Sequence, residues 1–143
     1  MQLPVRSVLM GLLAVPVVIS PLLAHNIQRS GEVAATFHIE PNHRPIAGKP
    51  SLTWLALTRR GGRLIPLTDC DCRLSVYAVP RAATAKPILQ APLRAINRER
   101  YQGIPAADIT FPKPGRYEVE LVGRHQLGTP FRPFRFTYLV IVR

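Results

Sequence analysis

His25 is the residue of this chain with the most specific potential chemistry, because it directly follows Ala24 at the end of an apolar N-terminal run. If the chain is cleaved after Ala24, the free amine and the imidazole of His25 can chelate one copper ion, a metal that imidazole suits well. Such a site needs further ligands, and the remaining histidines are His38, His43 and His125. The sequence therefore predicts a copper site at a mature N-terminus. The alternative is four ordinary surface histidines and a disordered terminus.

Cys70 and Cys72 form the second candidate, because residues two apart point to the same side of a strand. As thiolates they could bind copper(I) or zinc, and in an oxidising compartment they could be oxidised instead. They are in phase with Leu74, Val76 and Ala78, which alternate as expected core residues. We therefore expect the two sulfurs to face inward. A buried pair or a structural disulfide is the alternative to a metal site.

Arginine supplies most of the charge of this protein. The formal charge is +11, with 19 basic and 8 acidic residues, and 16 of the basic residues are arginine. Arg59, Arg60 and Arg63 flank Gly61-Gly62, a pair typical of a hairpin tip. Because arginine makes bidentate contacts to carboxylates and phosphates, this tip favours an acidic partner, and solvated surface arginines are the alternative. Little aromatic interleaving accompanies them, so specific nucleic-acid recognition is not expected.

Patterns of catalytic residues are not found in the sequence. It contains no phosphate-binding glycine loop, no Gly-x-Ser-x-Gly elbow and no His-Glu-x-x-His helix. Glu118 and Glu120 are expected on the outward face of a strand, as ion-pair partners for arginines on neighbouring strands. We therefore expect a protein that is not an enzyme.

The first 24 residues predict a secretory signal. Residues 1–6 carry one positive charge, residues 7–23 are almost wholly apolar, and Ala24 is a small residue suited to cleavage. The apolar run is short for a membrane span and contains two prolines, so an uncleaved anchor is the alternative. Residues 25–31 are polar and predict a flexible arm. The expected product is exported to the periplasm, the cell surface or the medium, and associates with a membrane only if the leader is retained.

Residues 32–143 predict an all-β domain. The 15 prolines disfavour long helices, and turn signals recur about every ten residues between about seven short strands. This pattern is typical of a two-sheet antiparallel sandwich of immunoglobulin type, preceded here by a signal helix. The expected strand segments are 32–40, 51–58, 64–79, 88–96, 106–111, 116–121 and 131–143. The expected loops are 41–50, 80–87, 97–105 and 123–130.

A sharp corner is expected in the segment Phe111–Glu120. Pro114-Gly115 predicts a turn, and Tyr117 follows the glycine by two residues. This spacing suggests a tyrosine corner, in which the hydroxyl bonds back to the upstream backbone at the edge of a sandwich.

Two turn motifs carry a resemblance to a known group of proteins. One is Pro45–Pro50, of the form Pro-x-Ala-Gly-x-Pro before a hydrophobic strand, and the other is Phe111–Tyr117 before the penultimate strand. With the cleavable leader and the histidine after it, they resemble the exported immunoglobulin-like domains grouped as YtkA-like. More distantly, they resemble periplasmic copper carriers of the copper-resistance protein C type. The resemblance spans most of residues 32–143.

This resemblance implies an exported binding or accessory module without catalytic activity. The copper carriers bind through a mature N-terminal histidine with further histidine and acidic side chains, and only His25 is carried over by position. The alternative function is a structural or interaction module of the cell envelope. It would contact another envelope protein or an anionic surface through its arginine-rich loops, without a metal.

Overall fold

The computed structural model describes residues 26–143 of this protein. The expected signal segment, its expected helix and His25 lie outside the described residues. The regular elements of residues 26–143 are strands and two short 3-10 turns, and none of them is a helix long and apolar enough to cross a membrane. The prediction of an all-β fold is confirmed.

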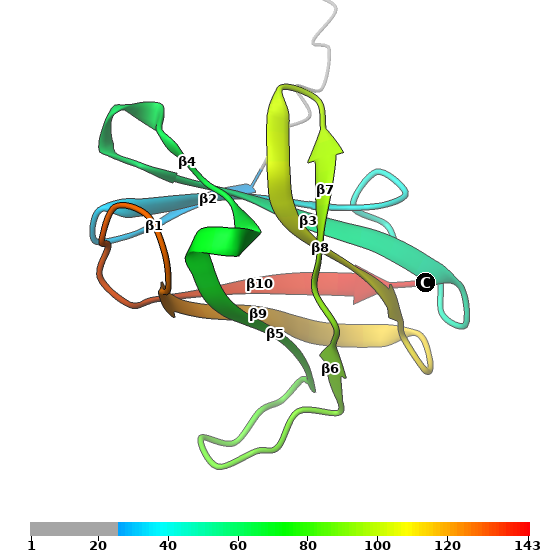
Figure 1. The fold of residues 1–143 in the computed structure, drawn as a ribbon. Helices are drawn as coiled ribbons and strands as arrows, with labels where there is room; N and C mark the ends of the chain where they lie inside the picture. Colours follow the sequence, from blue (N-terminus) through cyan, green and yellow to red (C-terminus); the bar gives the residue numbers. More distant parts are fainter. Residues whose placement is uncertain (1–25) are drawn as a thin grey trace, which may run out of the picture.

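The described residues form two antiparallel sheets that lie one above the other (Figure 1). Sheet I has the order β1-β2-β3-β8-β7, with the short β4 paired to β3, and sheet II has the order β10-β9-β5-β6. The strands of sheet I are β1 Asn26–Ser30, β2 Val33–Ile39, β3 Pro50–Arg59, β4 Leu64–Ile65, β7 Arg94–Arg98 and β8 Tyr101–Thr110. Those of sheet II are β5 Cys70–Ala78, β6 Leu89–Ala91, β9 Gly115–His125 and β10 Phe134–Val142. The 3-10 turns are η1 Arg60–Gly62 and η2 Leu67–Asp69.

The main core lies between the two sheets. Alternate residues of β2 and β10 are buried, as the sequence predicts for half-buried strands. Phe37 of sheet I stacks on Tyr138 of sheet II, with ring centroids 4.3 Å apart. Because burial of each large apolar side chain contributes about 1.5–3 kcal/mol, this layer holds the sheets together.

A second, smaller core covers the opposite face of sheet I. Trp54 of β3 is 1% exposed and clusters there with Ile104 of β8, against Leu64 and Tyr101. Leu57, of opposite parity to Trp54 on β3, belongs to the main core. Strand β3 is therefore covered on both faces.

The predicted corner is confirmed in the turn before β9. The Tyr117 hydroxyl donates a hydrogen bond to the Lys113 carbonyl oxygen, at 2.7 Å. The Tyr117 ring packs against Phe111, with centroids 4.9 Å apart, and Gly115 takes the positive φ of +150° that the turn requires. Pro114-Gly115 and the tyrosine thus act together to direct the chain into β9.

Several expectations about element boundaries are wrong. Residues 26–30, expected in a flexible arm, form β1 and pair along their whole length with β2. The expected strand 64–79 is interrupted at Pro66 and η2, because proline has no N–H for a ladder bond. The expected loop 97–105 is largely a hairpin of β7 and β8, in which the Asn97 side chain accepts a hydrogen bond from the Gly103 N–H at 2.9 Å.

The expected edge strand 88–96 is instead two strands in different sheets. Leu89–Ala91 pairs with β5 in sheet II, whereas Arg94–Arg98 pairs with β8 in sheet I. The chain therefore crosses between the layers at Pro92-Leu93, which the alternation of side chains alone did not reveal.

Candidate functional site

Two histidines meet at one end of sheet I. His38 lies on β2 directly opposite Trp54 of β3, and their rings stack with centroids 5.0 Å apart and planes 19° apart. His43 comes from the loop after β2, and its ring meets that of His38 edge-on at 4.7 Å. Of the predicted histidine ligands in the described residues, these two are brought together.

A tight turn after β2 positions His43. The backbone N–H of His43 donates to the Ile39 carbonyl at 2.8 Å, and Arg44 closes a second bond to Pro41 at the same distance. Asn42 and His43 have φ of 49° and 58°, in the left-handed region that non-glycine residues rarely adopt. The chain therefore reverses within a few residues and brings the His43 ring back toward β2.

The acidic residue between these two histidines in the sequence already has an ion-pair partner. Glu40 forms an ion pair with Arg98 of β7, on the side of the sheet that also carries the small core. Among residues 26–143, no group of three or more histidine, cysteine, aspartate or glutamate side chains is arranged to hold a metal ion.

His125 lies at the other end of the sheets, so the predicted four-histidine set is not brought together. It ends β9 opposite Cys70, its ring meets Phe131 edge-on at 5.7 Å, and its Nε2 lies 3.0 Å from the Gly128 carbonyl oxygen. Phe131 also lies beneath Arg59, which pairs with the first residue of β2. His38 and His43 are at the end of β2, so His125 is not available to them.

The cysteines do not supply thiolate ligands. Cys70 and Cys72 are joined in a disulfide in this structure, which is the arrangement of the structural alternative, and in this state the pair offers no free thiolate to a metal ion. Cys70 is 4% exposed and packs in the main core, as the strand parity predicts. The sulfurs sit over Gly123 of β9, where a Cβ would lie 2.8 and 2.9 Å from the two Sγ atoms. Glycine at this position makes the room that the disulfide needs.

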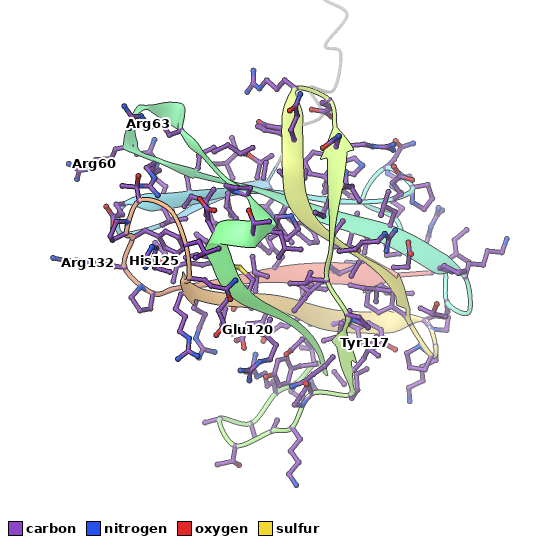
Figure 2. All side chains as sticks on the ribbon, viewed as in Figure 1. Arg60, Arg63, Tyr117, Glu120, His125 and Arg132 are labelled. Atoms are coloured by element: carbon purple, nitrogen blue, oxygen red, sulfur yellow. A yellow bond between two sulfur atoms is a disulfide. The ribbon has the colours of Figure 1, made fainter. Side chains whose placement is uncertain are left out.

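The predicted arginine hairpin is confirmed, but its three arginines differ in role. Arg59 donates from Nη2 to the Thr129 carbonyl oxygen at 2.6 Å and lies over the Phe131 ring. Arg60 and Arg63 are exposed, and neither has an acidic partner among the described residues. Figure 2 shows them projecting from the end of the molecule that also carries Arg132 and His125.

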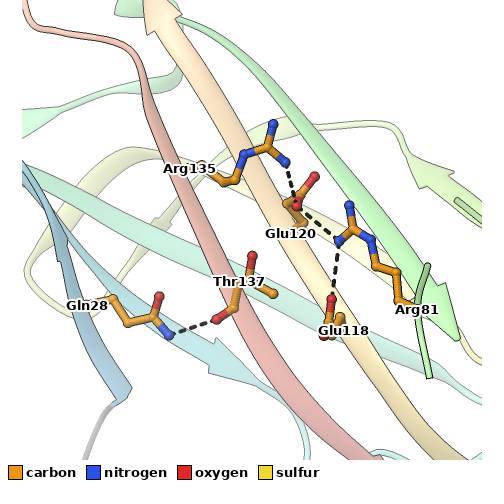
Figure 3. A network of polar contacts seen from close by, with 6 residues as sticks. All are labelled: Gln28, Arg81, Glu118, Glu120, Arg135 and Thr137. Carbon is orange, nitrogen blue, oxygen red and sulfur yellow. Dashed lines mark hydrogen bonds and ion pairs between the residues drawn. The ribbon is translucent and has the colours of Figure 1, made fainter. Parts of the chain in front are cut away.

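A charged network crosses the outer face of sheet II (Figure 3). Arg81 contacts Glu118 and Glu120 at 3.2 and 3.1 Å, and Arg135 contacts Glu120 at 2.7 Å. The Arg81 guanidinium also lies 3.4 Å from the centroid of the Tyr77 ring. Burial by itself lowers the pKa of Arg81, but the hydrogen bond and charge of Glu120, with the hydrogen bond of Glu118, outweigh it, so that this pKa lies above its ordinary value. The charged groups of this network pair with one another, so the network holds the loop that carries Arg81 to sheet II.

Glu118 and Glu120 pair with arginines as predicted, but only Arg135 of β10 lies on a neighbouring strand, because Arg81 comes from the loop between β5 and β6. Burial of Glu120, 5% exposed, was missed because the covering Arg81 comes from a loop far away in the sequence. Trp54 was also missed as a neighbour of His38, and the strand register is the signal that reveals it. Comparison of the chain with known protein families, with curated proteins and with solved structures gave no match.

Proposed function

We propose that this protein is an exported, non-catalytic binding module that holds copper through His25, His38 and His43. Cleavage after Ala24 would free the amine of His25, which forms a chelate with its own imidazole. His38 and His43 then complete the coordination with further imidazole nitrogens, ligands that copper accepts readily.

The observation that carries this proposal is the approach of the His38 and His43 rings to 4.7 Å. Imidazole nitrogens bind at about 2 Å from a metal ion, so rings that share an ion must lie within a few ångströms of one another. One ring is fixed on a paired strand and the other on a hydrogen-bonded turn. Little rearrangement is therefore needed for both rings to face one ion.

The start of β1 supports the inclusion of His25, although that residue lies outside the described part of the chain. His25 is joined to Asn26, whose Cα partner is Phe37, the residue next to His38. Consecutive Cα atoms are about 3.8 Å apart across a trans peptide bond, and Asn26 is the first described residue of this register. One further pair in the same register would join position 25 to His38, and this extension is part of the proposal.

Trp54 supports the proposal from the opposite side of His38. Its stacked indole limits the orientations of the His38 ring, which reduces the entropy lost when the ring binds an ion. It is also the only tryptophan of the chain. Its fluorescence therefore reports on the site without any label.

We further propose that the two sheets have an immunoglobulin-like topology. Its support is the pair of facing antiparallel sheets and the tyrosine corner formed by Tyr117 and Lys113.

Copper titration of the exported protein tests this function. N-terminal sequencing first establishes whether the mature chain begins at His25. Copper(II) is then added in competition with a chelator of known affinity, and Trp54 fluorescence is followed. We expect quenching at one equivalent, and a loss of affinity of at least about tenfold in both His38→Ala and His43→Ala, the usual scale for removal of a supporting metal-site group.

His125→Ala is the matched control, because it removes a histidine from the opposite end of the sheets. Its copper affinity should equal that of the unmodified protein. A mature start at another residue would remove the chelating amine from the proposal. Binding weaker than micromolar, or equal losses in all three histidine variants, would exclude the site altogether.

A further inference from the structure

Four exposed arginines gather at the end of the molecule remote from His38 and His43. They come from three segments: the β1 strand, the hairpin tip between β3 and β4, and the loop between β9 and β10. These segments meet at the left of Figure 1, and Figure 2 labels three of the four arginines there. We name this surface the arginine end, and its members are Arg29, Arg60, Arg63 and Arg132.

Specific contacts hold the three segments together. Arg59, at the base of the hairpin tip, bonds to the Thr129 carbonyl oxygen of the β9–β10 loop at 2.6 Å. The Arg132 N–H of that loop donates to Glu32 Oε1, beside the β1–β2 turn, at 2.9 Å. A hollow of about 320 Å³ lies between the β1–β2 turn and the hairpin tip, and Arg29, Thr58, Arg60 and Gly61 are among the residues that line it. The arginine end is thus a defined surface and not a set of independent tips.

The charge of this surface is not neutralised within the fold. None of its four arginines has an ion pair with an acidic side chain in residues 26–143. Two acidic residues lie at this end: Glu32 accepts a hydrogen bond from a backbone N–H of the loop, and Asp69 packs against Gly128 of the same loop. Neither forms an ion pair with one of the four arginines among the described residues. The surface therefore offers guanidinium groups that can bind phosphate or carboxylate in the bidentate manner that arginine favours.

An exposed leucine accompanies the arginines. Leu127 lies in the same loop as Arg132 and is 58% exposed. An exposed apolar side chain on the same loop as a cationic group is a combination suited to a bilayer surface, with the cations on headgroups and the apolar group below them. The centre of a protein interface is instead enriched in aromatic residues, and the exposed large hydrophobic side chains of residues 26–143 are all leucine or isoleucine.

We infer that the arginine end docks this protein on an anionic lipid bilayer, with Arg60, Arg63 and Arg132 on headgroup phosphates and Leu127 inserted between them. The contact needs no N-terminal anchor. The His38–His43 end, separated from it by the length of β2, faces away from the bilayer.

Vesicle binding by the full-length chain tests the inference. Co-sedimentation is measured with phosphatidylcholine vesicles and with vesicles containing about one third phosphatidylglycerol, at low and high salt. Because the N-terminal segment is present in every sample, the quantity of interest is the gain in affinity on adding the anionic lipid. Each arginine near such a surface contributes about 1 kcal/mol, so Arg60→Ser/Arg63→Ser/Arg132→Ser should reduce this gain by about a hundredfold.

A triple variant at the opposite end is the charge-matched control. Arg44, Arg116 and Arg143 are exposed there and have no ion pair with an acidic side chain among the described residues. Arg44→Ser/Arg116→Ser/Arg143→Ser removes the same charge and should retain most of the gain. Leu127→Ser should weaken anionic binding while its salt dependence is retained.

Two results would overturn the inference. One is an equal loss in both triple variants, which would show that net charge alone acts. The other is binding to soluble polyglutamate that depends on the arginine end, without a corresponding preference for anionic vesicles. That result would assign the surface to an acidic protein partner.

Discussion

Arginine has two different environments in this protein. On the outer face of sheet II, Arg81 and Arg135 converge on the nearly buried Glu120, and Arg81 also packs on the Tyr77 ring. At the arginine end the guanidinium groups reach solvent without an acidic partner among the described residues.

This difference shows why composition alone does not assign a use to charge. The charged network on sheet II holds a loop to the sheet, and its acidic and basic side chains pair with one another. The charges of the arginine end add little to the stability of the fold, since solvated arginines contribute little to the free energy of unfolding. A positive group that the fold does not use is the better candidate for an external partner.

Removal of Glu120 should give the largest effect on stability. In Glu120→Ala, Arg81 loses one of its two carboxylates and Arg135 loses its ion-pair partner, so the free energy of unfolding should fall by about 2 kcal/mol. Urea unfolding at neutral pH measures this change. Asp108→Ala is the control, because Asp108 and Arg94 form a pair in which both side chains are 50% exposed. The control should lose no more than about 1 kcal/mol, and equal losses would contradict the distinction.

Arg59 should show an intermediate effect. It belongs to the hairpin tip by sequence, but it bonds to Thr129 and lies over Phe131, as a structural arginine does. Arg59→Ala should therefore destabilise the protein by about 1 kcal/mol and increase hydrogen exchange in the β9–β10 loop. Arg63→Ala, four residues further along, is the comparison. If the two variants unfold alike, Arg59 does not brace the loop.

The arginine end should show the smallest effect on stability. Arg60→Ser/Arg63→Ser/Arg132→Ser removes three positive charges, yet the free energy of unfolding should change by less than about 0.5 kcal/mol for each substitution. The same urea series measures this change. A loss as large as that of Glu120→Ala would show that these arginines hold the fold, and the distinction between the two groups would fail.

The parts of the fold that sequence predicts well are those set by neighbouring residues. Alternation defines β2 and β10, and Pro114-Gly115-Tyr117 defines the corner. Prediction failed where the partner was distant. Residues 26–30 have no convincing strand pattern and become β1 only because the exposed edge of β2 accepts them. The split of 88–96 between two sheets likewise depends on which strand lies nearby.

The candidate sites follow the same division. The sequence identified His38, His43 and the hairpin arginines as residue types able to bind copper or anions. Strand parity also predicted correctly that Cys70 faces the core. It gave no means to group His38 with His43 and to separate them from His125. That grouping depends on the turn after β2 and on β9 ending at the other end of the sheets.

By itself, then, the sequence determined an all-β chain, its corner and which side chains of its strands face the core. The reason is that the alternation of side chains along a strand and a proline-glycine turn both act within a few residues. The tertiary structure alone decided that two histidines meet beside Trp54 and that four arginines from three segments share one end. Contacts between residues far apart in the chain depend on strand order and register. A local pattern of side chains fixes neither of these, because many pairings bury the same apolar face.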